Sequence, residues 1–273
     1  MADLTISITA YNNNPEKLKL TIDSVLSSTN DIILTIVDNS TTDKLSFLCV
    51  DKRVEYIHNS SNVGFGKAHN LAINKNFALS KYHLVLNPDV TFDGKILSSL
   101  ISFMDRNDSV GLVMPKVVYP DGTIQYLCKL LPTPFDLILR RFLPFKKYKE
   151  YRNNLYELKF SGYNSIMDIP YLSGCFMFMR KSVLSKSGLF DDRFFMYLED
   201  TDLSRRIHEI SRTVFFPEVS IIHAYEKGSY KNFKLLYYHV SSAVKYFNKW
   251  GWLNDTKRTK INNDTINRIK KTI

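Results

Sequence analysis

The first half of the chain alternates short apolar runs with helical repeats of apolar positions. Each run is typical of a strand because it is short and ends in a polar turn, whereas in each repeat the apolar side chains recur every three or four positions. The expected strands cover 4–8, 32–37, 54–58, 82–86 and 111–118, and the expected helices follow Asn14, pass through Asn70 and Ile73, and cover 96–104. This order predicts an α/β protein, Rossmann-like, with a mainly parallel central sheet flanked by helices.

Polar side chains gather where these strands end. Thr9 and Tyr11 follow the first strand, Asp38 and Asn39 the second, and Asp89 the fourth. In open sheets of this type, ligands bind beyond the carboxyl ends of the strands. The sequence therefore predicts a ligand site at this edge of the sheet.

The second half is less regular and richer in aromatic and basic residues. Its pattern predicts a buried strand over 171–179, a helix after the acidic stretch 199–202, a strand over 219–222 that ends at His223, and an aromatic helix over 233–250. The segment 137–152 interleaves apolar and basic side chains, which indicates an interfacial or lid segment. We expect the last twenty residues, polar and basic, to be frayed. We therefore divide the chain into a domain over 1–230 and a C-terminal helical extension with a basic tail over 231–273.

Composition and charge narrow the classes of protein. With 44% hydrophobic and 23% charged residues, the 273-residue chain is typical of a folded protein and not of a disordered, fibrous or repeat chain. The net charge of +10 favours an anionic partner such as phosphates, nucleic acid or an acidic membrane surface. The basic residues are dispersed and form no recognisable nucleic-acid module, so we expect no nucleic-acid partner.

The cysteines and the N-terminus indicate the compartment. Cys49, Cys128 and Cys175 are odd in number and far apart, which supports neither a disulfide framework nor a zinc module. The first residues do not form a basic and then apolar leader, and no window reaches the roughly 18 apolar residues of a membrane span. We expect a cytoplasmic protein that can sit on the inner face of the cell membrane as a peripheral protein.

Four sequence blocks carry a family resemblance. They are ITAYNN with VDNS, NVGFGKAHN, VLNPDV, and the long block SGCFMFMRKSVLSKSGLFDDRFFMYLEDTDLSRRI followed by IIHAYEKGS. In these blocks, which fall within residues 4–230, the chain resembles the family 2 glycosyltransferases of the GT-A fold, especially bacterial rhamnosyltransferases of O-antigen and surface polysaccharide synthesis. The resemblance implies an inverting transfer of a sugar, L-rhamnose or a relative, from a nucleotide-diphosphate donor to a saccharide acceptor on a polyprenyl diphosphate.

A metal site is implied by the third block and by the histidine. A sugar donor with a diphosphate needs positive charge at its leaving group, and oxygen ligands suit Mn or Mg. Asp89 resembles the last acid of the family's Asp-x-Asp motif, and His223 resembles the C-terminal metal-ligand histidine of some members. Asn87 replaces the first acid, which is expected to weaken metal binding or shift its selectivity. Asp89 as an Asx-turn residue and His223 as a satisfied strand-end histidine are the structural alternatives.

The general base is implied by the acidic stretch. Inverting transfer needs one group that takes the proton of the acceptor hydroxyl during attack, and Asp200 matches the family position for that base. Glu199 would position Asp200 or bind acceptor, and Asp202 would be a supporting or helix-capping group. Arg206 would pair with one of these acids or contact phosphate. Alternatively, the acids only favour the positive end of the following helix.

The resemblance also implies a nucleotide site at the strand ends. Thr9 and Tyr11 match positions that contact base and ribose, and Asp38 would accept a hydrogen bond from the base or the ribose. The remaining residues assigned to nucleotide binding are Asn62, Gly64, Asn70 and Asn87. For Asp38 and Gly64, a turn is the structural alternative.

Three other functions compete with sugar transfer. A glycoside hydrolase would use two carboxylates but leave the strand-end aspartates without a role. A nucleotidyltransferase would need a basic, glycine-rich loop after the first strand, where this chain has TAYNNNP. A non-catalytic binding module for nucleotide or glycan would tolerate the loss of Asp200. The basic, aromatic segments 137–152 and 233–250 and the tail over 257–271 further predict contact with an anionic membrane surface.

Overall fold

The central element of the fold is a nine-stranded mixed sheet. The computed structural model describes residues 2–137, 146–225 and 233–272. The strands are β1 (Ala2–Ala10), β2 (Ile32–Asp38), β3 (Val54–His58), β4 (Ser80–Leu86), β5 (Val90–Thr91), β6 (Val110–Val118), β7 (Cys128–Lys129), β8 (Met167–Asp168), β9 (Tyr171–Leu172), β10 (Phe176–Arg180) and β11 (Arg212–His223). Their order in the main sheet is β3-β2-β1-β4-β10-β6-β11-β5, with β8 on β11, while β7 and β9 form a separate pair.

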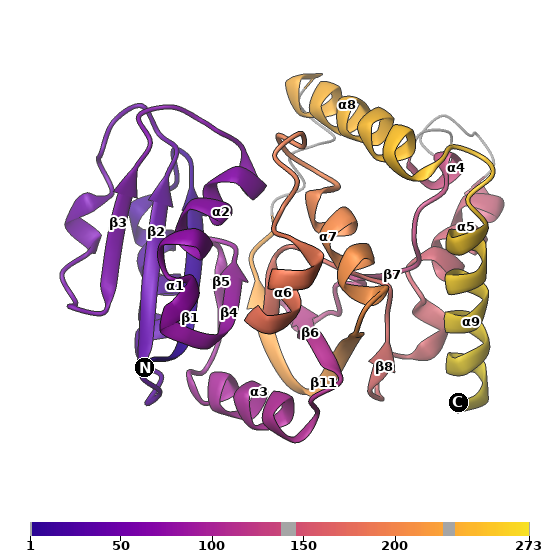
Figure 1. Ribbon diagram of the computed structural model, residues 1–273, viewed down its shortest axis with the longest axis horizontal. Coiled ribbons are helices and arrows are strands. Elements are labelled where there is room, and N and C mark those ends of the chain that lie inside the picture. The colour runs from indigo at the N-terminus through magenta and orange to yellow at the C-terminus, as the bar shows by residue number, and fades with distance from the viewer. Residues whose placement is uncertain (1, 138–145, 226–232, 273) are drawn as a thin grey trace.

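Most strands of the main sheet run in one direction. β1, β2, β3 and β4 pair in parallel, and so do β6 and β11. β10 is inserted antiparallel between β4 and β6, and β5 pairs antiparallel with the end of β11. The sequence prediction of a mainly parallel α/β sheet is confirmed, and the parallel strands bring their carboxyl ends to one edge (Figure 1).

The helices lie between the strands and in the C-terminal part of the chain, and α1 begins where the local sequence predicts. They are α1 (Pro15–Leu26), α2 (Phe65–Lys75), α3 (Lys95–Arg106), α4 (Pro134–Leu137), α5 (Lys146–Tyr156), α6 (Lys181–Ser187), α7 (Glu199–His208), α8 (Phe233–Trp250) and α9 (Thr256–Thr272), with short 3-10 turns at Ser46–Leu48, Phe77–Leu79 and Lys159–Ser161. At α1 the predicted cap is confirmed, because Asn14 Oδ1 accepts from the Glu16 and Lys17 N–H groups at 2.8 and 3.1 Å. Pro15 then occupies the first helical position.

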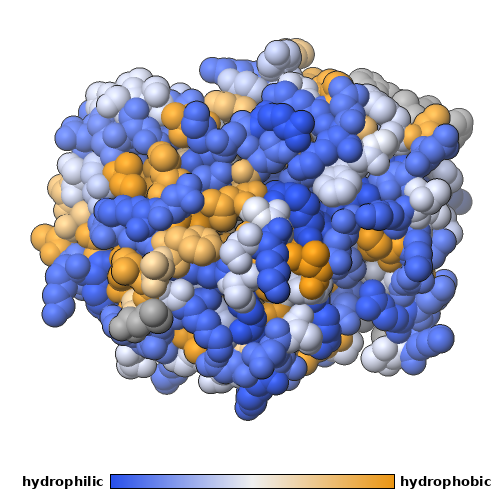
Figure 2. Space-filling model, in the orientation of Figure 1, coloured by the Kyte–Doolittle hydropathy of each residue, from blue (hydrophilic) through white to orange (hydrophobic). Residues whose placement is uncertain are grey.

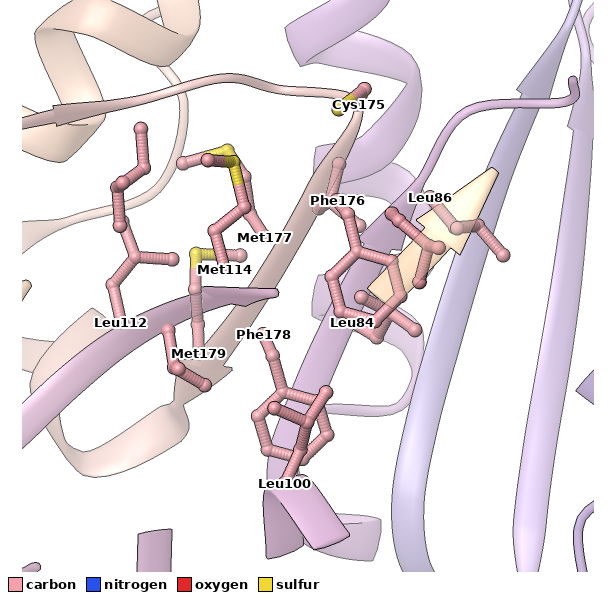
Figure 3. Packing of buried hydrophobic residues seen from close by; sticks show 14 of the residues in the cluster. Leu84, Leu86, Leu100, Leu112, Met114, Cys175, Phe176, Met177, Phe178 and Met179 are labelled. Atoms are coloured by element: carbon pink, nitrogen blue, oxygen red, sulfur yellow. The ribbon is translucent and has the colours of Figure 1, made fainter. Parts of the chain in front are cut away.

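The sheet is buried on both faces, and alternate residues of each strand point to different helices. Figure 3 shows Phe178 and Leu84 on the face toward Leu100 of α3. The other face carries a buried polar chain in which Ser7 Oγ lies 2.7 Å from His69 Nδ1 of α2 and 2.8 Å from His83 Nε2. The central strands β1 and β4 therefore place apolar residues on one face and several buried polar residues, including Ser7 and His83, on the other.

The strand expected over 171–179 is interrupted. β9 ends at Leu172 and β10 begins at Phe176, so Ser173, Gly174 and Cys175 form a break between them. The break exists because the Gly174 N–H donates to Asp200 Oδ2 at 2.8 Å instead of joining a ladder. The apolar pattern continues through the break, and this is why the sequence predicted one continuous strand.

The last strand of the sheet is longer than expected. The sequence predicted a strand over 219–222, but β11 begins at Arg212. Its pairing with β6 changes register between Phe216 and Ser220. Pro217 lies in this irregular part, where a missing N–H is tolerated.

The expectation of a frayed C-terminus was wrong. α9 is an ordered helix that packs Ile269 into the main core. Its Asn262 accepts from the Leu131 N–H at 2.8 Å and donates to the Leu131 carbonyl at 2.9 Å. The low overall hydropathy hid a helix whose few inward residues contact the α5 side of the molecule.

The sequence also predicted a helix over 233–250 and an interfacial segment over 137–152. α8 confirms the predicted helix over 233–250. Of the expected interfacial segment 137–152, residues 138–145 lie outside the described residues, and so does the block from 226 to 232. The division of the chain at residue 230 stays a prediction.

Candidate active site

A cleft of about 920 Å³ lies at the edge of the sheet where the parallel strands end. Four of the predicted site residues contribute to its lining: Asn87, Glu199, Asp200 and His223. They come from the end of β4, the start of α7 and the end of β11, segments that are far apart in the sequence. The fold therefore brings the candidate base and part of the candidate metal set to one cavity.

The candidate metal residues meet where β5 pairs with the end of β11. In that pairing His223 lies opposite Val90, so that its ring approaches Asp89. His223 Nε2 is 3.3 Å from Asp89 Oδ1 and 3.4 Å from Asn87 Nδ2. The Asp89 Oδ1 atom is buried and accepts no hydrogen bond.

Gln125, which the sequence reasoning missed, fixes the His223 ring. The Gln125 side-chain amide donates to the His223 carbonyl at 2.7 Å, and its Oε1 faces His223 Nδ1 at 2.9 Å. Nδ1 therefore carries a proton, and Nε2 is directed toward Asp89 and Asn87. A second ring nitrogen held in this way is typical of histidines that bind metals.

The charge state of His223 is set by these neighbours. Burial lowers the pKa of His223, but the Asp89 carboxylate and the Cys175 sulfur raise it more, to about 10. The position of Nε2 therefore favours a positive charge. A metal ion there would have to displace a proton from Nε2.

The residues present fit a divalent cation with a sparse ligand set. Asp89 Oδ1 and the Asn87 amide nitrogen both lie within 3.4 Å of His223 Nε2. A cation there would be held by the Asp89 oxygen, the His223 nitrogen and, after rotation of the amide, the Asn87 oxygen. Within the described ranges, no three His, Cys, Asp or Glu side chains come together as a metal site. The site therefore has one carboxylate fewer than the family's Asp-x-Asp motif provides, as expected because Asn87 replaces the first acid.

Asp200, at the start of α7, is held by donors from three residues, including the Thr201 hydroxyl, which donates to Oδ1 at 3.3 Å. Its Oδ2 accepts from the Gly174 N–H at 2.8 Å and from the Tyr171 hydroxyl at 3.3 Å, and its Oδ1 accepts from the Thr201 N–H at 2.7 Å. A side chain at position 174 would crowd the base, because an added Cβ at Gly174 would lie 3.1 Å from the Asp200 Cβ. These contacts fix the carboxylate in the cleft.

The backbone before Asp200 is strained. Tyr197 and Leu198 have φ values of +69° and +67°, in the left-handed region that bulky residues rarely adopt. Such strain persists only where the surrounding structure enforces it, and it is common at functional sites. Here it turns the chain so that Glu199 and Asp200 enter the cleft at the first turn of the helix.

Glu199 has an environment unlike that of Asp200. It is 5% exposed, and its buried Oε2 has no hydrogen-bond partner. Burial, and then the charge of Asp200, raise the pKa of Glu199 well above its usual range. Within this pair, burial therefore favours the neutral form of Glu199.

Asp202 and Arg206 are structural residues of α7. Asp202 is fully buried, and Arg206 Nε donates to it at 2.9 Å. Arg206 also donates to the carbonyls of Ser187, Gly188 and Leu189. Of the two roles predicted for Arg206, the structure thus shows the ion pair.

The C-terminal extension supplies partners for Asp202 that the sequence did not reveal. Lys249 Nζ lies 2.7 Å and Trp250 Nε1 2.8 Å from Asp202 Oδ1. The Arg205 guanidinium lies over the Trp250 ring at 4.0 Å and pairs with Asp255. The C-terminal extension therefore contacts and stabilises α7, the helix that carries Asp200.

The predicted nucleotide residues at β1 and β2 lie outside the lining of the cleft. Thr9 Oγ1 is buried and has no hydrogen-bond partner, and Tyr11 is 48% exposed. Asp38 is fully buried and accepts from the Ser40 N–H and the Tyr56 hydroxyl, at 2.8 and 2.7 Å. Their roles in nucleotide binding stay predictions.

The other predicted nucleotide residues join the start of α2 to the loop before α7. Asn62 Oδ1 accepts from the Gly64 N–H at 3.0 Å. Gly64 has a φ of +92°, and an added Cβ would lie 2.4 Å from the Phe195 carbonyl oxygen. Asn70 bonds the Phe190 backbone in both directions and donates to Asp192. The structure assigns Gly64 and Asn70 a role in holding this loop, and their contact with nucleotide stays a prediction.

Sequence comparisons identify relatives over most of the chain. The family model described as glycosyl transferase family 2 matches residues 5–188. The chain is 24% identical over 260 residues to the N-acetylglucosaminyl-diphospho-decaprenol L-rhamnosyltransferase of Mycobacterium tuberculosis, an alignment that covers 88% of this chain and 83% of the relative. It is also 24% identical over 210 residues to the low-salt glycan biosynthesis hexosyltransferase Agl10 of Haloferax volcanii, covering 75% of this chain and 61% of the relative.

Solved structures share the fold. The structure of GalNAc-T7 with UDP, GalNAc and Mn²⁺ superposes with a TM-score of 0.62 at 14% identity, covering 82% of this chain and 44% of that chain. Staphylococcus aureus TarS 1–349 superposes with a TM-score of 0.59 at 14% identity, covering 97% of this chain and 71% of that chain. The predicted GT-A fold with C-terminal helices is thereby confirmed.

Proposed function

The chain belongs to glycosyl transferase family 2, and we propose that it is an inverting, metal-dependent hexosyltransferase of surface polysaccharide synthesis. The donor is a nucleotide-diphosphate sugar, with L-rhamnose as the proposed sugar. The acceptor is a saccharide linked to a polyprenyl diphosphate. The Mycobacterium tuberculosis relative, an N-acetylglucosaminyl-diphospho-decaprenol L-rhamnosyltransferase, supports the choice of this sugar and of this acceptor.

One observation carries the proposal. The carboxylate of Asp200 and the set formed by Asn87 and His223 line the same cleft, and Asp89 joins that set through its contact with His223. Inverting transfer needs both groups, a base for the acceptor and positive charge for the leaving group, on opposite sides of the anomeric carbon.

In the proposed reaction Asp200 acts as the general base. The acceptor hydroxyl gives its proton to Asp200 while its oxygen forms a bond to the anomeric carbon. The bond from that carbon to the donor phosphate breaks, and its electron pair leaves with the nucleoside diphosphate. Four hydrogen bonds hold Asp200 in place before substrate arrives, which reduces the cost of orientation.

Asp89, His223 and Asn87 would hold a Mn or Mg ion at the donor diphosphate. Such an ion, when bound, supplies positive charge to the leaving phosphate. Gln125 keeps His223 Nε2 directed at this position. Thr9, Tyr11, Asp38 and Asn62 would contact base and ribose at the ends of β1 and β2, with Gly64 and Asn70 shaping the pocket wall.

Membrane contact is part of the proposal. The outward side of α8 presents Phe233, Tyr237, Val240 and Val244, which are 91, 68, 42 and 38% exposed. The helix contains no acidic residue, which favours an anionic lipid surface at the cytoplasmic face. None of the helices in the described residues is long and apolar enough to span a bilayer. Sedimentation with anionic and with neutral vesicles tests this contact, and equal binding to both would contradict it.

Replacing Asp200 by Asn tests the reaction. Transfer to a lipid-linked acceptor should fall by about 10²- to 10⁴-fold, while binding of nucleotide and metal is retained. Asp264→Asn, on the exposed side of α9, is the matched control. Full activity of the Asp200→Asn variant would favour the competing proposal of a binding module.

A further inference from the structure

The cleft extends past Asp200 into a half that the proposed reaction leaves without a role. This half is formed by the segment after β6, the end of α5 and β9. Its lining contributes charged and aromatic side chains, namely Tyr126, Lys129, Glu157, Lys159 and Tyr171. Two of the five are cations.

Lys129 lies one side chain away from the candidate base. It faces Tyr171 across the two-stranded β7 and β9 sheet, and its Nζ is 5.4 Å from the centre of the Tyr171 ring. The Tyr171 hydroxyl donates to Asp200 Oδ2 at 3.3 Å. A molecule that places a hydroxyl on Asp200 therefore meets the charge of Lys129 within the length of one tyrosine.

Lys159 stands in the same wall beside an aromatic ring and an acid. Its Nζ is 4.8 Å from the centre of the Tyr126 ring and 3.0 Å from Glu157 Oε2. Tyr126 packs edge-on against Tyr163, with ring centres 5.2 Å apart. The Tyr163 hydroxyl is in turn fixed by the Cys128 and Glu157 carbonyls, at 3.0 and 2.7 Å. The wall is thus built from buried, hydrogen-bonded parts before any ligand is present.

The chemistry of this wall suits a ligand that is both sugar and phosphate. Ammonium groups are point charges that bind phosphate. A carboxylate such as Glu157 accepts hydrogen bonds from sugar hydroxyls, and tyrosine rings offer flat apolar faces. Lys159 pairs with Glu157 and Lys129 lies beside Tyr171, so both ammonium groups line the cleft where a phosphate could contact them.

We propose that Lys129 and Lys159 bind the diphosphate of an isoprenoid-diphosphate acceptor whose sugar lies between Glu157 and Tyr171. This subsite rests on the proposed function, because it requires the acceptor hydroxyl at Asp200. It gives the cleft two phosphate positions of different chemistry. The donor diphosphate would meet the set at Asp89 and His223, and the acceptor diphosphate would meet lysines.

Binding of farnesyl diphosphate to the full chain tests the subsite. Titrations are made in EDTA, so that no divalent ion can hold the probe at the donor position. Farnesyl diphosphate should bind more tightly than farnesol, and inorganic pyrophosphate should displace it. Lys129→Gln and Lys159→Gln should each weaken binding roughly tenfold or more. Lys129→Arg should restore most of the affinity.

A matched control and a parallel measurement separate the possible failures. Lys186→Gln, on the exposed side of α6, should bind the probe like the wild type. Equal binding of farnesol and farnesyl diphosphate, no displacement by pyrophosphate, or unchanged binding by the Lys129 and Lys159 variants would each overturn the subsite. If the proposed function is wrong, the wild type should instead show no metal-dependent binding of nucleotide. With a lipid-linked acceptor, the two lysine variants should raise the acceptor KM and leave the donor KM unchanged.

Discussion

Replacing Lys249 by Met tests how strongly the C-terminal extension stabilises the helix that carries the candidate base. Lys249 reaches from the end of α8 to Asp202 of α7 at 2.7 Å, and its side chain is 22% exposed whereas that of Asp202 is fully buried. It also contacts Asp191 at 2.9 Å. The substitution keeps the length of the side chain and removes only the ammonium group.

The structure sets the size of the effect. Without Lys249, Asp202 keeps Arg206 and Trp250, at 2.9 and 2.8 Å, so the carboxylate loses one of three donors. A hydrogen bond to a charged, buried group contributes about 1.5–3 kcal/mol. For a chain of this size, this corresponds to a fall in Tm of roughly 3–12 °C.

Urea and thermal unfolding of the wild type, Lys249→Met and Lys245→Met measure the effect. The control is Lys245→Met, one turn earlier on α8, where the ammonium donates to the Arg193 carbonyl at an exposed position, at 2.6 Å. Its cost should stay within about 0.5 kcal/mol. A double-mutant cycle with Asp202→Asn should give a coupling of about 1 kcal/mol or more. If Lys249→Met is no less stable than Lys245→Met, the claim that the extension stabilises α7 through Asp202 is refuted.

Three other buried features give measurable outcomes. Burial lowers the pKa of His69 to about 3. Below the unfolded value of about 6.5, the unfolded state therefore binds a proton that the folded state does not, and the free energy of unfolding falls by about 2 kcal/mol at pH 5. A His69→Asn variant that loses the same stability between pH 7 and pH 5 would contradict this. Gly64→Ala should lose more stability in urea than Gly122→Ala, because only Gly64 has a neighbouring carbonyl in the way, and equal losses would contradict the steric argument. Because burial and then Asp200 raise the pKa of Glu199 well above its usual range, Glu199→Gln should keep its Tm at pH 7, and a fall of several degrees would show that the carboxyl is ionised.

The parts of the fold that the sequence predicted are those with local causes. β3 and α8 agree with the expected ranges 54–58 and 233–250, because periodicity and turn residues mark both ends. The candidate residues Asp200 and His223 were found from motif blocks, and the sheet topology then placed them on one cleft. Strand ends that are distant in sequence meet at one edge for general reasons, so this meeting was predictable.

The parts that the sequence did not predict depend on contacts between distant segments. Nothing in the pattern around Gln125 marks it as the partner of His223, which is 98 residues away. Likewise, nothing in the sequence around Tyr171 marks it as a hydrogen-bond partner of Asp200. The order of α9 rests on a few inward residues such as Asn262 and Ile269, whose partners are in other segments and whose own helix is largely polar.

The surface offers little further evidence of function in the view of Figure 2. Hydrophilic side chains cover most of that face, and apolar residues gather mainly on its left half, with smaller patches elsewhere. Exposed apolar residues are common on folded proteins and do not by themselves identify a partner. The proposed reaction therefore rests on the cleft, and the proposed membrane contact rests on the exposed side of α8.

The most direct test of the account is the thermal stability of the purified chain with dTDP, UDP, GDP and CMP, each with and without Mn²⁺ or Mg²⁺. A ligand at 100 times its Kd stabilises by roughly 2.7 kcal/mol, which for this chain length is a rise in Tm of roughly 5–11 °C. The account predicts such a rise with one nucleotide, dependent on metal and lost in Asp89→Asn, with dTDP indicating rhamnose transfer. No rise with any nucleotide and metal would contradict the assignment of a nucleotide-sugar donor.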